Sequence, residues 1–185
     1  MERPILKVEE ELDKEKPKFL YHGSRHRGLD ELEPKAHRHR DPGEGERVFA
    51  TQDLAMATIF MARTYKGCGI FGDVVYAYII EPREEFIEDD KGGHVYVLPS
   101  DNFVSDPNKG LGKYEWTSDV KVKPVDKIEF PSTLDAMIEN GVQVYFIDQE
   151  THERIDKADD HGLSIFESLE SENQRRGTNV RVFPK

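Results

Sequence analysis

Short apolar runs separated by long polar stretches dominate the hydrophobic pattern of the chain. The run VVYAYII at 74–80 is continuous and of strand length, which is typical of a central strand of a sheet. In contrast, residues 120–123 alternate between valine and lysine, which predicts a strand with one face in water. Together with weaker candidates, the pattern predicts strands at 19–22, 48–50, 74–80, 95–98, 114–116, 120–123, 142–148 and 179–183.

Helical spacing occurs in fewer places. The first predicted helix starts near Thr51 and Asp53, which supply polar groups for its N-terminus, and KGCG at 66–69 is expected to end it. A second, short helix is predicted over 134–140, because Ser132 and Asp135 resemble a capping box. Residues 165–169 are a third, amphipathic candidate. The apolar face of the first helix is formed by Leu54, Ala57, Thr58, Met61 and Tyr65.

Many short strands, two or three helices and no βαβ regularity predict an α+β fold. Residues 1–16 are mostly charged and are expected to form an N-terminal arm. We expect one domain over 17–148, with residues 149–185 as a charged C-terminal extension packed on it. Residues 24–46 are predicted to be a long loop, and EEFIEDD at 84–90 a solvated acidic loop.

Composition limits the classes of partner. The chain has 185 residues, 34% of them charged, and a formal net charge of −11, which argues against broad binding to nucleic acid. The only dense basic segment is 25–40. A single cysteine, Cys68, excludes an internal disulfide, and no apolar stretch approaches the roughly 18 residues of a membrane span. With no apolar centre of a signal peptide near its start, the chain is predicted to be soluble and cytoplasmic.

Three stretches resemble the ADP-ribosyltransferase superfamily, which includes PARP-like enzymes and RNA 2′-phosphotransferases. They are LYHGS at 20–24, VFAT at 48–51 running into DLAMATIFMA, and YEWTSDVKVKP at 114–124. The resemblance covers about residues 17–130. It implies an α+β fold in which a split β-sheet clamps NAD, with a few short helices.

The resemblance also implies roles for individual residues. His22 would hydrogen-bond the adenosine-side ribose, and Gly23 would offer its backbone to the nicotinamide amide, to which Ser24 would add a hydroxyl. Phe49 or Phe60 would stack on the nicotinamide ring, although both are equally readable as core residues and the family's usual tyrosine is absent from both positions.

The resemblance also implies a catalytic acidic residue, and two interpretations of its position are open. Glu115 precedes an aromatic residue and a V-x-P stretch, as the catalytic glutamate does in several bacterial members, and it would stabilise the developing positive charge on the ribose. Alternatively, His94 opens the strand HVYVL and the acid is missing.

The basic loop at 24–46 supplies further candidate binding residues. Its residues Arg38 and Arg40 are expected to contact the phosphate end of NAD. His37 and His39 lack further ligands at metal-binding spacing, so no metal is expected.

The leading hypothesis is an NAD-dependent mono-ADP-ribosyltransferase or an NAD glycohydrolase, which cleaves the bond between nicotinamide and ribose. NAD would be its substrate, and a protein acceptor is favoured over nucleic acid. One alternative is an enzyme similar to the RNA 2′-phosphotransferases, although Tyr21 replaces the arginine that these enzymes have before the histidine, and Ser24 replaces their threonine. The other is a catalytically inactive module that binds ADP-ribose, NAD or a protein.

Overall fold

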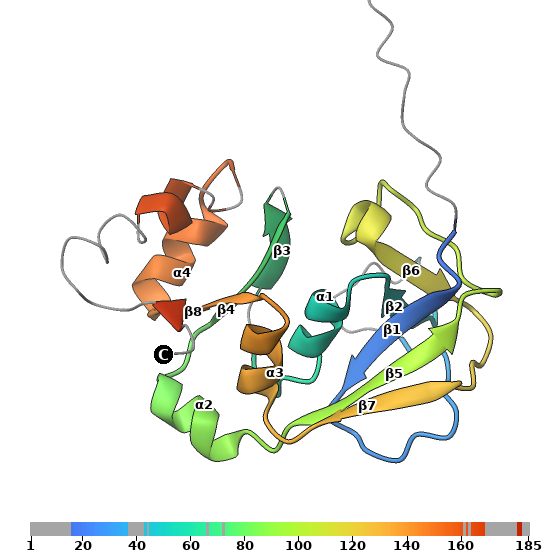
Figure 1. Cartoon of the computed structure of the whole chain (residues 1–185). Helices are drawn as coiled ribbons and strands as arrows, with labels where there is room; N and C mark the ends of the chain where they lie inside the picture. Colours follow the sequence, from blue (N-terminus) through green and yellow to red (C-terminus); the bar gives the residue numbers. More distant parts are fainter. Residues whose placement is uncertain are drawn as a thin grey trace, which may run out of the picture.

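The computed structural model describes residues 16–36, 43, 45–65, 67–71, 73–160, 162, 164–168 and 181–182. Two β-sheets with short helices between and beside them make an α+β fold, as the pattern of apolar runs predicts (Figure 1). The charged arm at 1–15, as well as Arg38, Arg40, His37 and His39, lie outside the described residues. No helix in the described part of the chain has the length and apolar character to cross a bilayer.

The five-stranded sheet is antiparallel, and its strands lie in the order β6-β2-β1-β5-β7. Its outer face is closed by loop residues Leu32, Phe103 and Val122, which pack on apolar side chains such as Leu20 and Leu98. The strands are β1 (Phe19–Ser24), β2 (Val48–Thr51), β5 (Gly93–Pro99), β6 (Glu115–Ser118) and β7 (Asp126–Phe130).

The four-stranded sheet has the order β3-β4-β8-β9. Its strands are β3 (Gly67–Phe71), β4 (Val74–Ile79), β8 (Gln143–Phe146) and β9 (Arg181–Val182), and the pair β4–β8 is parallel. Two glycines of β3 are covered by tyrosine rings of β4: a Cβ at Gly67 would lie 2.4 Å from the ring of Tyr78, and one at Gly69 would lie 2.5 Å from the hydroxyl of Tyr76.

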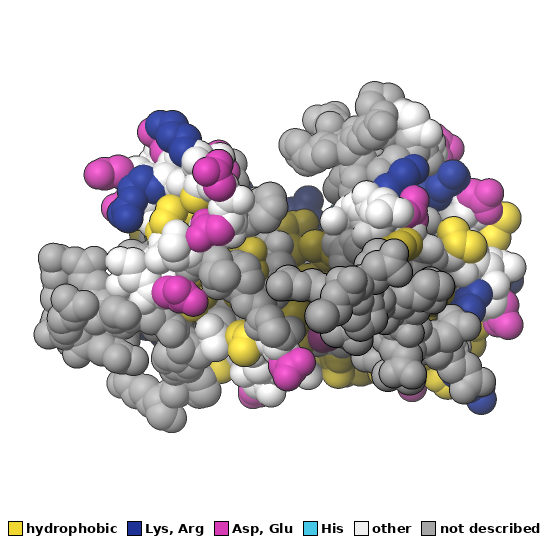
Figure 2. Space-filling model, turned by 90° about the horizontal axis from the view of Figure 1, so that it is seen from above, with side chains coloured by type: hydrophobic (Ala, Val, Ile, Leu, Met, Phe, Trp, Pro, Cys, Tyr) yellow, Lys and Arg dark blue, Asp and Glu magenta, His cyan; other side chains and the backbone are white. Residues whose placement is uncertain are grey.

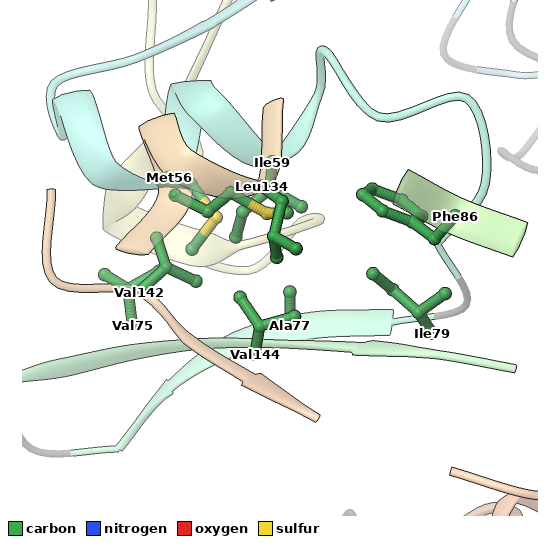
Figure 3. Packing of buried hydrophobic residues seen from close by; sticks show 10 residues of the cluster. Met56, Ile59, Val75, Ala77, Ile79, Phe86, Leu134, Val142 and Val144 are labelled. Carbon is green, nitrogen blue, oxygen red and sulfur yellow. The ribbon is translucent and has the colours of Figure 1, made fainter. Parts of the chain in front are cut away.

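Helices α1 (Leu54–Ile59) and α3 (Thr133–Glu139) lie between the two sheets (Figure 1). Both begin at the predicted caps: Asp53 accepts a hydrogen bond from Met56 N, and Ser132 accepts one from Asp135 N. Figure 3 shows side chains of the two helices meeting those of β4 and β8 in one core. The labelled residues of that core are Met56, Ile59, Val75, Ala77, Ile79, Phe86, Leu134, Val142 and Val144.

Several predicted elements are wrong. The first helix ends at Ile59, and the glycines expected to end it belong to β3, because glycine is the residue that leaves room for the tyrosine rings. Residues 120–123 form no strand; Val122 makes only an isolated bridge with Leu32, and the strand that follows is β7.

The acidic segment at 84–90, which was predicted to be a solvated loop, is helical instead. It forms helix α2 (Arg83–Asp89), which buries Phe86 against Phe146 with ring centroids 5.6 Å apart. In the C-terminal extension, helix α4 (Gln149–Asp156) and a turn of helix at 164–168 place Ile155 and Phe166 against the tyrosines of β4 and β8.

Candidate functional site

Strands β1 and β2 separate at His22. β1 pairs with β5 from Phe19 to Ser24, but its register with β2 is confined to Tyr21 opposite Thr51. A continued antiparallel ladder would set Gly23 opposite Phe49. Instead, the imidazole of His22 lies 2.7 Å from the carbonyl oxygen of Phe49, measured from Nδ1. A fork therefore opens between the two strands, and the His22 side chain bridges it.

The hydrogen bond to Phe49 fixes the tautomer of His22. A carbonyl oxygen only accepts, so Nδ1 must carry a hydrogen and donate it. Burial lowers the pKa of His22 below its ordinary value, although the bond to Phe49 acts in the opposite direction, and the nearby charge of Lys35 lowers it further. At neutral pH the ring is therefore neutral, and Nε2 presents a lone pair that can accept a hydrogen bond from a hydroxyl group.

Gly23 lies directly under helix α1. A Cβ at this position would lie 1.8 Å from the carbonyl oxygen of Ala57 and 3.4 Å from the Cβ of Phe60. The glycine is thus required by the close approach of α1 to β1. This packing also brings Phe60, a predicted ring-stacking residue, next to Gly23.

Glu115 opens β6, beside the end of β2, where its register partner is Thr51. Its exposed fraction is 8%, and it lines a cavity of about 200 Å³. The other lining residues come from β6, from the segment before β2 and from the loop beside β6: Gly43, Arg47, Val104, Asp106, Lys109 and Thr117.

The register assigns His22 and Glu115 to opposite faces of the sheet. Tyr21, Thr51 and Glu115 form one row, so their side chains share a face. Trp116, the next residue on β6, packs on the other face with the cluster that includes Leu20, as the predicted alternation requires. His22 also alternates with Tyr21, so a ligand that touches both His22 and Glu115 has to pass through the fork.

The predicted stacking residues lie on different elements. Phe49, on β2, is half-buried, and its register partner on β6 is Thr117. Phe60 follows α1, packs against the core between the sheets and meets the ring of Tyr65 edge to face at 5.8 Å. Phe60 therefore has a packing role and lies next to Gly23, whereas Phe49 is the residue that a continued ladder would set opposite Gly23.

Ser24 and His94 belong to a buried polar network at the far side of β1. The hydroxyl of Ser24 accepts from His26 N, and its register partner on β5 is His94. The Tyr96 hydroxyl donates to His26 O at 2.9 Å, so Nδ1 of His94, 3.3 Å away, must be the donor to the Tyr96 oxygen. Nε2 of His94 is buried without a hydrogen bond. Strands β2 and β1 lie between the strand of His94 and the strand of Glu115. The two residues considered for the catalytic position therefore lie in different parts of the sheet.

Cys68, on β3, lies within electrostatic reach of Glu115, on β6. Burial, together with the charge of Glu115, raises the pKa of the Cys68 thiol to about 11, so the thiol remains protonated and is a poor nucleophile. Figure 2, seen from above relative to Figure 1, shows a hollow between the half that carries α4 and the half that carries β6, with hydrophobic side chains at its bottom. Among the residues that the structure describes, no three metal-binding side chains gather.

Sequence reasoning missed two residues near the fork. Lys35 and Arg47 form an isolated antiparallel bridge beside β2; Lys35 lay in the segment 24–46 that we expected to be a loop, and Arg47 directly follows that segment. Their pairing joins positions twelve residues apart in the chain and leaves no periodic signal in the sequence. A larger cavity of about 760 Å³ lies elsewhere, between the end of β1, the end of α1 and helix α2.

No protein-family model matches the chain, and neither curated proteins nor solved structures yield a significant match.

Proposed function

We propose that this protein cleaves the bond between nicotinamide and ribose in NAD, and transfers the ADP-ribose to an acceptor or to water. The observation that carries the proposal is the fork between β1 and β2. There the neutral imidazole of His22 offers Nε2 as an acceptor, and the buried carboxylate of Glu115 lines a cavity one strand away. The resemblance to ADP-ribosyltransferases, which suggested both residues from the sequence, supports assigning them to NAD.

The proposed chemistry requires positioning and charge more than proton transfer. Nε2 of His22 accepts a hydrogen bond from a hydroxyl of the adenosine-side ribose. Glu115 stabilises the positive charge that develops on the other ribose as its C1′–N bond lengthens. The electron pair of that bond leaves with nicotinamide, an acceptor oxygen or nitrogen then forms the new bond to C1′, and the proton of the acceptor is released to solvent.

The burial of the site favours such electrostatic stabilisation. A carboxylate that is 8% exposed acts through a medium of lower dielectric than water, where its attraction for a nearby cation is stronger. The half-buried ring of Phe49 and the ring of Phe60 are the candidates for holding the nicotinamide ring near Gly23.

A second candidate function follows from the two faces of the sheet. Because His22 and Glu115 project to opposite faces, a ligand held by His22 alone would leave the carboxylate unused. The protein would then bind NAD or ADP-ribose without cleaving it. An enzyme acting on an RNA 2′-phosphate remains the third alternative.

Measurement of free nicotinamide tests the proposal. We expect the purified protein to release nicotinamide from NAD, and we expect His22→Ala to raise the KM for NAD, since it removes a contact to the substrate. Glu139→Gln, which changes an exposed carboxylate at the end of α3, is the matched control and should leave the KM unchanged.

Absence of nicotinamide release, together with binding of ADP-ribose that depends on His22, would contradict catalysis and favour the binding module. Release that requires a 2′-phosphorylated RNA would favour the third alternative.

A further inference from the structure

Thr117 lies beside Glu115 in the smaller cavity. The two residues are two positions apart on β6, so their side chains project from the same face of the strand, with Cα atoms about 7 Å apart. Both residues line the cavity of about 200 Å³. A carboxylate and a hydroxyl from one strand therefore face the same cavity.

The backbone of Thr117 is held from both sides. Its N–H and carbonyl groups bond to Val104 at 2.8 and 2.9 Å, and its register partner on the other side is Phe49. Because both backbone groups point to Val104, Thr117 and Phe49 form a non-hydrogen-bonded pair, in which side chains lie closest. Within the described residues the Thr117 hydroxyl makes no hydrogen bond, so it is available to a ligand.

The charges around this cavity balance. Glu115 and Asp106 supply two carboxylates, and Arg47 and Lys109 supply two cations. The Asp106 carboxylate accepts a hydrogen bond from Asn108 N and so closes its own turn. Because neither sign is in excess, an uncharged group that forms hydrogen bonds fits the lining better than a phosphoryl or an ammonium group does.

The volume of the cavity limits its occupant to a single ring. A cavity of about 150 Å³ holds benzene, whereas pockets for drug-sized ligands start at about 300 Å³. At about 200 Å³ this cavity admits a pentose ring, and the rest of a dinucleotide would lie outside it. Size and charge together favour a sugar ring with hydroxyl groups.

We infer that Thr117 positions the ribose on which Glu115 acts. This inference rests on the proposed function, in which that ribose is the one attached to nicotinamide. A carboxylate only accepts hydrogen bonds, so one ribose hydroxyl donates to Glu115. The Thr117 hydroxyl can donate or accept, and it binds the adjacent hydroxyl of the same ring. Two contacts to two adjacent hydroxyls fix the orientation of the ring, which a single contact to Glu115 leaves open.

Binding of ADP-ribose and of ADP, measured by calorimetry, tests this role without catalysis. Thr117→Val keeps the branched shape of the side chain and removes its hydroxyl, so we expect the affinity for ADP-ribose to fall roughly tenfold. ADP lacks the ribose in question and should bind the variant as it binds the wild type. Thr117→Ser, the matched control, retains the hydroxyl and should bind ADP-ribose within about twofold of the wild type.

A purely structural role of Thr117 would lower the affinity for both ligands alike, and that result overturns the inference. It is also overturned if the wild type does not bind ADP-ribose, or if Thr117→Val binds ADP-ribose as the wild type does. Binding that responds as expected, without nicotinamide release from NAD by the wild type, would keep Thr117 as a ribose contact and refute the proposed function. Nicotinamide release together with ADP-ribose binding that ignores Thr117→Val would refute the role of Thr117 alone.

Discussion

Gly23 has a packing role that does not depend on any ligand. The carbonyl oxygen of Ala57 occupies the place where a Cβ would be, so the backbone of α1 sits on β1 at this residue. The motif that contains His22 and Gly23 therefore has a structural explanation as well as a functional one. A variant of Gly23 that loses ligand binding cannot by itself separate the two.

We therefore predict that Gly23→Ala is strongly destabilising. The added methyl group has to push α1 away from β1, and overpacking of this kind costs about 1–3 kcal/mol. Urea unfolding of the variant measures the loss. Ser24→Ala, which removes one hydroxyl that accepts from His26 N, is the neighbouring control and should cost about 1 kcal/mol. Equal stability of Gly23→Ala and the wild type would show that α1 is not held this closely.

Asp90 joins the end of α2 to the start of α3. Its carboxylate accepts hydrogen bonds from Ser132 Oγ and from the backbone N–H groups of Thr133, Leu134 and Gly92. Burial alone would raise the pKa of Asp90, but these four bonds together lower it below the ordinary value of 3.8. The carboxylate also lies at the positive end of α3.

This network predicts a pH-dependent loss of stability. Because the folded pKa is the lower one, the contribution of Asp90 is fully present above about pH 4 and disappears as the pH falls through the folded value. Asp90→Asn should cost about 1–2 kcal/mol at pH 7, allowing for partial exposure. Urea unfolding from pH 7 to 2.5 should show the gap to the wild type closing in acid. The control Asp119→Asn, an exposed aspartate, should show no such gap.

At the scale of elements, helix α2 is the clearest difference from the sequence prediction. Five of its seven residues are charged, which favours a solvated loop. Its single buried side chain, Phe86, nevertheless packs edge to face on Phe146 and joins the core between the sheets.

We predict that α2 depends on this one anchor. Phe86→Ala should lower the free energy of unfolding by about 3–5 kcal/mol, because it empties a core position. Ile87→Ala, on the same helix but 47% exposed, should change it by less than about 0.5 kcal/mol. Similar small effects of both substitutions would mean that α2 packs loosely, as a solvated segment would.

Local signals in the sequence predicted most strands and the caps of two helices. The run VVYAYII became β4, and Asp53 and Ser132 cap α1 and α3 as expected. Non-local contacts explain the wrong predictions. The glycines of KGCG are typical of a helix end, and the local sequence contains no information about the β4 tyrosines that pack on them. For the candidate site, the sequence suggested His22 and Glu115, but the fork and the Lys35–Arg47 bridge come from pairing between distant segments.

At the scale of the whole molecule, the two sheets are joined by a core made by α1 and α3 (Figures 1 and 3). The carboxylate of Glu115, on β6, is near enough to Cys68, on β3, for its charge to raise the pKa of that thiol. We propose that this region binds NAD and that Glu115 promotes its cleavage.

The kinetics of nicotinamide release by Glu115→Gln test this claim most directly. The substitution preserves shape and removes charge, so kcat should fall on the order of a hundredfold while KM for NAD changes little, because the charge acts mainly as the bond breaks. Glu139→Gln, assayed alongside, should retain full activity. Nicotinamide release by Glu115→Gln at the wild-type rate would contradict the assignment of Glu115 to catalysis.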